Sequence, residues 1–326
     1  MLNEARHLAA AVGSALGQDY DGPIEVVIAL GPSSDTTDDV AASLTSSDER
    51  VCTVTNPSGR TPEGLNLAIG ATRYPIVARV DGHSQLPPDY VRVAVDLLER
   101  TGADNVGGLM WAVGVTDFEK AVARAMTSKL GVGNARFHVG GEEGPADSVY
   151  LGVFRRSALE RVGGYDEAFA RAQDWEMNYR IRKSGGKVWF SPALRVSYRP
   201  RASLSALAEQ YLHYGRWRRE VMREHPETVN LRYLAPPIAL VLFSAGLVAG
   251  VAGVRWAFAL PAGYVGLVVA GAAAIGRGLP LRARAVLPVV LATMHGAWGT
   301  GFLTSWRSQR SGGAEVLLSG DNVQRR

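Results

Sequence analysis

Several features that would define a class of protein are scarce or missing in this 326-residue sequence. Cysteine occurs once, as Cys52, so no disulfide can form within the chain and a reducing cytoplasm is permitted. The formal net charge is only +4, which is too small to indicate nucleic-acid binding. No Gly-x-Gly-x-x-Gly follows the first expected strand, which argues against a nicotinamide-dependent dehydrogenase. The first 16 residues contain Glu4 and Arg6 and lack a long apolar core, unlike a signal peptide.

Charge is also missing from three long stretches near the carboxyl end. Residues 233–254, 256–275 and 285–306 contain no Asp, Glu, Lys or Arg. Each is long enough to cross a hydrocarbon core of about 30 Å, and tryptophans lie at or near the stretch ends, as amphipathic rings do at membrane interfaces. The absence of charge disfavours a transporter. We therefore expect a membrane region over residues 233–306 with about three apolar helices, followed by a polar tail over 307–326. A buried hairpin of core helices is the alternative, and the number of full crossings stays open.

Arginines suggest an orientation in the membrane. Arg277, Arg282 and Arg284 lie between the second and third apolar stretches, and three crossings return them to the side of the N-terminal domain. The positive-inside rule then predicts a multi-pass cell-membrane protein with that domain in the cytoplasm, although Arg307 and Arg310 would lie outside. Five further arginines between residues 216 and 232 suit contact with anionic lipid headgroups, or simply a solvated helix face.

Strand and helix patterns alternate through residues 1–232. This alternation predicts an α/β domain with a mostly parallel sheet, helices on both faces and ligands at the carboxyl ends of the strands. Asn3 is positioned to cap the first helix. The glycine-rich segment 111–150 is expected to be a mobile loop region near a site. The expected strands are 25–30, 51–55 and 76–80, and the expected helices are 3–16, 61–71 and 87–99.

Two groups of residues in this domain can carry chemistry. Asp81-Gly82-His83 ends an expected strand, where a carboxylate can hold a metal or a sugar hydroxyl and a ligand two residues later points to the same side of an extended segment. The second group is Gly163-Gly164-Tyr165-Asp166-Glu167 followed by Gln173-Asp174-Trp175-Glu176, in which the acids open a helix at its positive dipole end. Read separately, the first group is consistent with a plain turn and the second with ordinary helix-start acids.

In combination, these motifs resemble family-2 glycosyltransferases of the GT-A fold, and most closely bacterial exopolysaccharide glucosyltransferases of the succinoglycan type. The resemblance covers about residues 1–220, and the apolar tail also fits that subgroup. The matching motifs, in order, are Leu2-Asn3-Glu4, the strand and turn over 26–35, Asn66 within Glu63-Gly64-Leu65-Asn66-Leu67-Ala68, Asp81-Gly82-His83, Gly163-Gly164-Tyr165-Asp166-Glu167 and Gln173-Asp174-Trp175-Glu176.

The resemblance implies a function and a role for each matching residue. Such an enzyme inverts the sugar's anomeric centre in one displacement, in cell-surface polysaccharide or glycolipid synthesis. The donor is a nucleotide-sugar, the acceptor is lipid-linked or otherwise membrane-associated, membrane lipids are partners, and nucleic acid is not. Asp174 corresponds to the general base for the acceptor hydroxyl. The remaining residues are expected at the donor site: Glu4, Asp35, Asn66 and Asp81 for the nucleotide-sugar, and Asp81 with His83 for a divalent metal, Mn²⁺ or Mg²⁺.

The sequence departs from the family pattern in places. Leu30 and Gly31 stand where many members carry paired aspartates, which keeps a catalytically inactive membrane-bound scaffold or partner subunit as the alternative function. Gln210 and Arg216-Trp217 are not spaced as in processive synthases, so transfer of single sugars is expected. Met1 stands where the family's first strand ends. We expect either that this strand is encoded upstream, or that the chain is a fragment with weakened folding and nucleotide binding.

Overall fold

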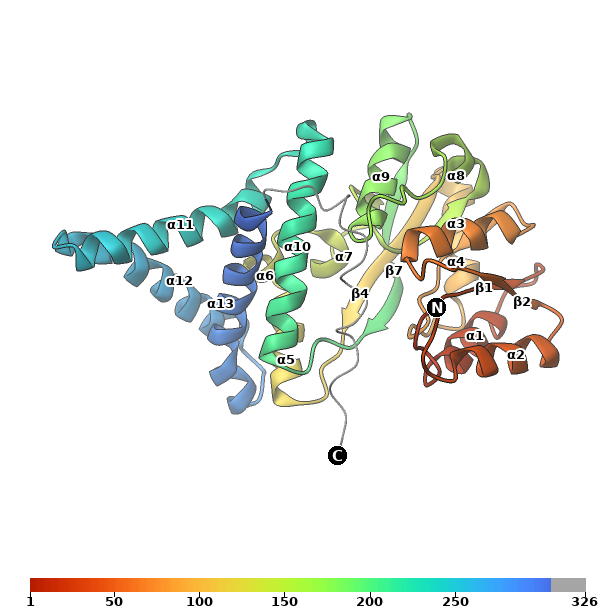
Figure 1. Ribbon diagram of the computed structural model, residues 1–326, viewed down its shortest axis with the longest axis horizontal. Helices are drawn as coiled ribbons and strands as arrows, with labels where there is room; N and C mark the ends of the chain where they lie inside the picture. The colour runs from red at the N-terminus through yellow and green to blue at the C-terminus, as the bar shows by residue number, and fades with distance from the viewer. Residues whose placement is uncertain (306–326) are drawn as a thin grey trace. The chain divides into compact units, whose positions relative to one another are not determined.

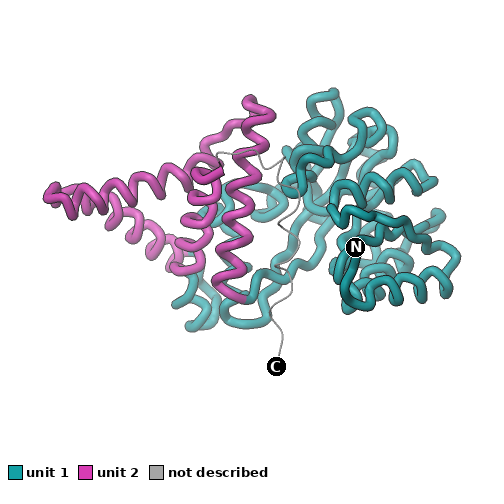
Figure 2. Tube along the Cα trace, viewed as in Figure 1, with its two compact units in different colours: residues 1–202, 275–287 teal, residues 203–274, 288–326 magenta. Residues whose placement is uncertain are grey.

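The computed structural model describes residues 1–305, and its contacts divide the chain into two compact units (Figures 1 and 2). Unit 1 contains residues 1–202 and 275–287, and unit 2 contains residues 203–274 and, of the described chain, residues 288–305. The expected polar tail over 307–326, with Arg307 and Arg310, lies outside the described residues, as does Trp306. The expected boundary of a catalytic domain at residue 232 stays a prediction.

Unit 1 begins with a small two-stranded sheet. Strand β1 (Val26–Leu30) pairs in parallel with β2 (Val51–Thr55). Helices α1 (Leu8–Leu16) and α2 (Thr37–Ser47) supply apolar residues to a shared core with these strands. Helix α3 (Thr61–Ala71) packs against both strands. The core residues of this part are Leu8, Val12, Ile28, Ala41 and Val51.

The rest of unit 1 is built on a five-stranded sheet with strand order β3-β6-β4-β7-β5. Only β4 and β7 pair in parallel, and the other neighbours are antiparallel, so this sheet is mixed where a mostly parallel one was expected. Gly108 permits a register shift between β4 and β7, because a Cβ there would lie 1.5 Å from the carbonyl oxygen of Leu194. The strands are β3 (Ile76–Ala78), β4 (Asn105–Ala112), β5 (Gly144–Pro145), β6 (Tyr150–Arg155) and β7 (Val188–Tyr198).

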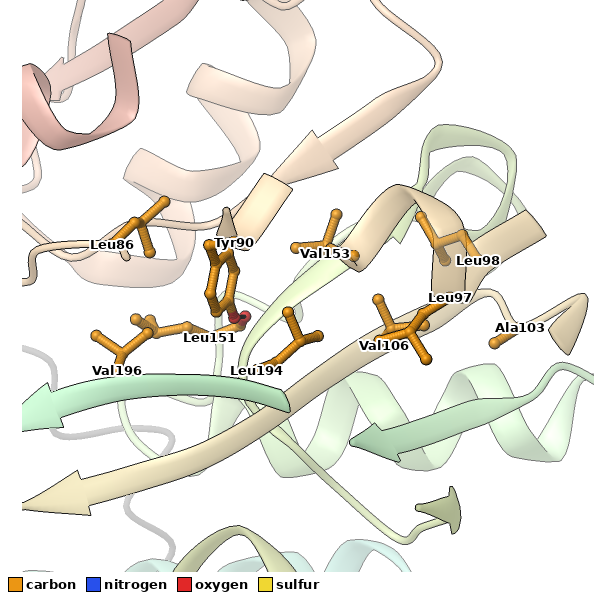
Figure 3. Close-up of a cluster of buried hydrophobic side chains, with 11 residues drawn as sticks. Leu86, Tyr90, Leu97, Leu98, Ala103, Val106, Leu151, Val153, Leu194 and Val196 are labelled. Carbon is orange, nitrogen blue, oxygen red and sulfur yellow. Dashed lines mark hydrogen bonds between the residues drawn. The ribbon is translucent and has the colours of Figure 1, made fainter. Parts of the chain in front are cut away.

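Helix α4 (Tyr90–Thr101) covers one face of this sheet and carries much of the core (Figure 3). Its apolar residues recur at helical spacing, and Leu97 and Leu98 are buried against Val106 of β4. Full burial of such a side chain contributes about 1.5–3 kcal/mol. The hydroxyl of buried Tyr90 donates to the carbonyl of Leu151 at 2.7 Å, so its polar end is satisfied inside the core.

The first helix differs from its prediction. Helix α1 begins at Leu8, and its N-cap residue is His7. Asn3 does not cap it, because its backbone has φ +56° and its side-chain oxygen accepts from the backbone N–H of Ser34 at 2.8 Å. A tertiary contact therefore occupies the side chain that local sequence assigned to the helix. The other predicted strands and helices of this region occur with small shifts at their ends.

The glycine-rich segment over 111–150 is more ordered than expected. It contains α5 (Asp117–Met126), which begins with a capping box: Thr116 accepts from the N–H of Glu119, and Glu119 accepts from the N–H of Thr116. The prediction of an irregular loop was wrong here, because Thr-x-x-Glu is itself a helix-start signal. The helices of unit 1 that follow α5 are α6 (Lys129–Val132), α7 (Arg136–Val139), α8 (Arg156–Val162) and α9 (Gln173–Lys183).

The described part of unit 2 consists of helices. Within residues 1–305, three segments are long and apolar enough to cross a membrane: Leu231–Val251, Arg255–Ile275 and Leu281–Thr304. Many of their apolar side chains face outward, among them Val251 and Leu281, which are 77% and 80% exposed. This exposure favours lipid contact over the alternative of buried core helices. The helices are α10 (Leu204–Glu224), η1 (Pro226–Thr228), α11 (Leu231–Val251), η2 (Arg255–Phe258), α12 (Ala259–Ile275) and α13 (Leu281–Thr304), the last beginning in unit 1.

Several arginines expected at lipid headgroups have partners inside unit 2. Arg219 donates to the carbonyl of Phe302 at 2.9 Å, and Arg223 donates to the carbonyl of Ser305. The guanidinium of Arg218 lies 4.1 Å from the centre of the Tyr233 ring. These cations bind the carboxyl end of α13 and the first turn of α11, and headgroup contact by the cluster stays a prediction.

Candidate active site

A buried arginine joins the two acids that the sequence motifs singled out. Arg79 directly follows β3, and only 9% of its side chain is exposed. Its guanidinium contacts Oδ1 of Asp81 at 2.9 Å and also pairs with the carboxylate of Asp174. The acid expected to bind the donor and the acid expected to act as base therefore lie one guanidinium apart, after the carboxyl end of β3 and at the amino end of α9. Such double pairing orders both carboxylates before any ligand binds.

The environment of Asp174 suits a base. Its side chain is 43% exposed at the surface of the site, but protein surrounds it on the other sides. Desolvation raises the pKa of Asp174, Arg79 opposes this rise, and the negative charge of Asp81 adds to it. The hydroxyl of buried Tyr165 lies beside the pair outside strict hydrogen-bond geometry. A carboxylate with a raised pKa is a better proton acceptor near neutral pH.

The loop that carries Tyr165 is held by Asn66. The Asn66 side chain accepts from the Tyr165 N–H at 2.8 Å and donates to the Tyr165 carbonyl at 2.9 Å. Gly164 has φ +74°, and a Cβ there would lie 2.7 Å from Oδ1 of Asn66, so the loop needs glycine. Asn66 thus contacts the Gly163–Glu167 segment, whereas the sequence assigned it to the nucleotide-sugar.

Helix α9 presents Asp174 in its first turn, as predicted. Ala172, just before the helix, has φ +60°, a conformation that costs a non-glycine residue about 1–3 kcal/mol. Buried Glu176 faces inward and pairs with Arg180 at 2.6 Å. Asn178 accepts from Asn105 of β4 at 2.6 Å, which ties the helix to the sheet beneath it. These contacts fix the direction in which the helix start points.

Asp81 and His83 lie in a turn, closed by a bond from the Ser84 N–H to the Asp81 carbonyl at 2.9 Å. The expectation of an extended segment with both side chains on one side was wrong, because β3 ends at Ala78 and the chain turns at Gly82 and His83. Asp81 points to Arg79, while Nδ1 of His83 lies 3.0 Å from Oε1 of Glu4. That hydrogen bond raises the pKa of His83 above its ordinary value. Glu4, Asp81 and His83 thus share one corner of the site, although residues 1–305 contain no three-ligand metal cluster.

Asp35 organises the adjoining loop. Its carboxylate accepts from the N–H of Thr37 at 3.0 Å and from the N–H of Ala5 at 3.2 Å. Hydrogen bonds from Thr37 lower the pKa of Asp35. Thr37 in turn accepts from the Glu4 N–H at 2.8 Å, so Asp35 supports the segment that carries Glu4. Gly31, where an acid was missing, donates its N–H to the Met1 carbonyl at 2.7 Å.

Three residues of the site were not predicted from the sequence. Arg79 and Arg201 were not singled out, and Tyr165 was noted only as part of the Gly163–Glu167 motif. Arg201 is exposed after β7 and close enough to His83 to oppose the rise in its pKa. Arg79 stands two residues before Asp81 in an otherwise apolar strand pattern, and that charge was the available signal. Arg201 gave no such signal, because its place in the site depends on the path of β7.

Acids that gather at a strand end beside a helix start suit a transferase that uses a nucleotide-sugar. The family model described as "Glycosyl transferase family 2" matches residues 1–163, and the chain belongs to this family. The resemblance inferred from the motifs is thereby confirmed.

Individual proteins support the same assignment. The chain is 33% identical over 312 residues to the succinoglycan biosynthesis protein ExoA of Rhizobium meliloti (strain 1021), covering 94% of this chain and 92% of that protein. It is 22% identical over 222 residues to a dolichyl N-acetyl-alpha-D-glucosaminyl phosphate 3-beta-D-2,3-diacetamido-2,3-dideoxy-beta-D-glucuronosyltransferase of Methanococcus voltae, covering 65% of this chain and 69% of that protein.

A solved structure shares the fold. The mannosyltransferase PcManGT from Pyrobaculum calidifontis, in complex with GDP-Man and Mn²⁺, superposes with a TM-score of 0.57 at 19% identity, over 94% of this chain and 84% of that chain. This likeness and the family match confirm the predicted α/β fold of the GT-A type.

Proposed function

We propose that this family 2 glycosyltransferase inverts the anomeric centre of a sugar as it moves it from a nucleotide-sugar to a lipid-linked acceptor. The catalytic unit would lie at the cytoplasmic face of the cell membrane and serve cell-surface polysaccharide or glycolipid synthesis. One observation carries the proposal: Arg79 holds Asp81 and Asp174 on opposite sides of one guanidinium. The names of the succinoglycan and dolichyl-phosphate relatives and the three apolar helices support the acceptor class.

The reaction is a single displacement. The acceptor hydroxyl approaches Asp174, which takes its proton while the oxygen attacks the anomeric carbon. The bond from that carbon to the diphosphate breaks on the opposite face, so the configuration inverts. Arg79 positions Asp174 and keeps its carboxylate from rotating away from the acceptor hydroxyl. Exposed Arg201 adds positive charge on the side of His83, where the diphosphate leaves.

The donor corner has the ligands for one divalent cation. Both contacts from Arg79 reach Oδ1 of Asp81, which leaves Oδ2 to bind a metal. The Glu4 carboxylate contacts Nδ1 of His83, so Nε2 of the same ring can bind a metal. The His83 side chain is 53% exposed. A carboxylate behind a histidine is the usual arrangement at metal ligands. Two protein ligands suit an ion that also binds diphosphate oxygens and water, and such an ion would neutralise charge on the leaving group.

Three other predicted binding residues would act at different distances from the donor. We assign Glu4 to the donor corner through His83, and Asp35 to the loop that holds Glu4. Asn66 would position Tyr165 and not touch the nucleotide.

The test uses the full chain in detergent with a panel of nucleotide-sugars, reading release of nucleoside diphosphate. We expect release with at least one donor, its loss in excess chelator, and recovery with Mn²⁺. The anomeric configuration of the product, read by NMR, should be opposite to that of the donor. Retention of configuration would contradict the single displacement. Absence of turnover with every donor and acceptor would favour the inactive scaffold.

A further inference from the structure

A hollow at the far end of β4 lies apart from the residues described above. It has a volume of about 290 Å³. One wall is the end of β4 and the loop after it, with Trp111 and Val113, and another is the face of α5 that carries Lys120 and Arg124. Leu279 completes it. Its wall is therefore partly apolar and partly cationic, and no acid lines it.

The hollow is connected to the segment between two apolar helices. Arg124 donates to the carbonyl of Ile275 at 2.6 Å and to the carbonyl of Arg277 at 3.2 Å. Ile275 is the last residue of α12, and Leu281 begins α13. If these helices span the membrane, as the proposed function requires, the short segment between them lies at the bilayer surface. Leu279 belongs to that segment, so the hollow opens at headgroup depth.

Exposed side chains around the hollow have the chemistry of a membrane interface. Trp111 and Val113 are 50% and 44% exposed, and Leu281 is 80% exposed. Arg277 is exposed on the connecting segment, and Arg282 is exposed in the first turn of α13. The Lys120 ammonium takes part in none of the hydrogen bonds or ion pairs found among residues 1–305. Its charge is thus available to a ligand.

From these observations we infer that the hollow binds the headgroup of an anionic phospholipid of the surrounding bilayer. Lys120 and Arg277 would contact the phosphate, and Trp111 and Val113 would pack on the glycerol and upper acyl carbons. Charge complementarity and the direct connection to the membrane segment select this occupant. The site would hold the catalytic unit against the membrane, where a lipid-linked acceptor arrives.

The experiment is native mass spectrometry of the full chain in detergent, titrated separately with phosphatidylglycerol, phosphatidylcholine, an isoprenoid monophosphate and inorganic phosphate. We expect phosphatidylglycerol to be retained in preference to phosphatidylcholine. Lys120→Glu should weaken that retention about tenfold, since a basic residue near an anionic surface contributes several-fold by itself and reversal doubles the change. Val113→Glu, at an exposed position, should do the same without altering a buried residue.

Lys129→Glu is the matched control, because Lys129 is exposed on the next helix and does not line the hollow. It should retain the lipid. Equal retention in all variants, or equal binding of both phospholipids, would overturn the inference. Preferential binding of the isoprenoid phosphate, lost in Lys120→Glu, would assign the hollow to the acceptor and overturn the phospholipid. Donor hydrolysis without acceptor, measured in parallel, reports on the proposed catalytic function separately from lipid retention.

Discussion

At the scale of single residues, Arg79 connects parts of the chain that sequence keeps far apart. It reaches across 95 positions to Asp174 and across two to Asp81. Its charge has two effects on the site: it holds Asp174 in one orientation, and it limits how far desolvation raises the pKa of that acid. The two effects can be tested separately, because Asp174 and Arg79 can each be replaced by a side chain of similar shape.

Replacing Asp174 with asparagine keeps the size of the side chain and removes its basicity. Sugar transfer should fall at least about a hundredfold, because general-base catalysis contributes about 10²–10⁴. Donor binding, measured by calorimetry, should survive. Asp89→Asn at the N-cap of α4, where the side chain is 55% exposed, is the control and should transfer normally. Near-normal turnover of Asp174→Asn would remove Asp174 from the mechanism.

The pH dependence of kcat/KM tests Arg79. Asp174 must be ionised to accept a proton, so activity is lost as the pH falls through its pKa, which lies above the ordinary 3.8. Arg79→Gln removes the cation that lowers this pKa, so the acidic limb should move to higher pH. Arg79→Lys keeps the positive charge, so the acidic limb of the pH profile should stay near that of the wild type. Its kcat should be lower, because an ammonium lacks the planar, forked donors of the guanidinium. An unmoved limb in Arg79→Gln would contradict the assignment.

At the scale of elements, the Gly163–Glu167 loop fixes Tyr165 through a fit between backbone and side chain. Two adjacent glycines have similar positive φ, +76° at Gly163 and +74° at Gly164, but only the second meets a neighbour. Substitution of Gly163 therefore tests backbone strain alone, whereas substitution of Gly164 tests backbone strain together with contact with Asn66.

Gly163→Ala should cost about 1–2 kcal/mol, the ordinary penalty for a left-handed alanine. Gly164→Ala should cost more and also slow transfer, because its Cβ would push Asn66 away from Tyr165. Urea unfolding and initial rates measure the two effects. Adding Asn66→Ala to Gly164→Ala should recover little, since the hydrogen bonds to Tyr165 are then absent. Equal stability and rate in the two glycine variants would show that the contact is unimportant.

The elements also show why prediction from sequence succeeded unevenly. Helix α9 was predictable because its acids stand at a helix start, and the first strands because their apolar runs are short and bounded by turn residues. The start of α1 was not, because Asn3 bonds to a residue 31 positions away. The mixed order of the large sheet likewise depends on which strands meet, and apolar runs do not encode that. Of the site, the acids were visible as motifs, but the arginine that joins two of them was not.

At the scale of the whole molecule, the single cysteine reports the orientation of the catalytic unit. Cys52 is exposed on β2 of unit 1. With that unit in the cytoplasm, a membrane-impermeant thiol reagent should label Cys52 in inside-out vesicles and not in intact spheroplasts. The control is Ala252→Cys in a Cys52→Ser background, because residue 252 is exposed between the first two apolar helices. It should label with the opposite pattern. Labelling of Cys52 in intact spheroplasts would reverse the proposed orientation.

The discontinuity of unit 1 has a consequence for biosynthesis. Its last segment, residues 275–287, leaves the ribosome after the 72 residues of 203–274 have been added. At a synthesis rate of about 5–20 residues per second, this interval is roughly 4 to 14 s. During that time Arg124 cannot form its hydrogen bonds to the carbonyls of Ile275 and Arg277, which have not yet been made. The enzyme's first-made unit is thus completed by one of its last-made segments, after two apolar helices have reached the insertion machinery. We expect protease to cleave near α5 in ribosome-bound chains arrested before residue 275 emerges, and to spare it in longer ones. Equal cleavage at all chain lengths would show that α5 folds into its protected form without residues 275–287.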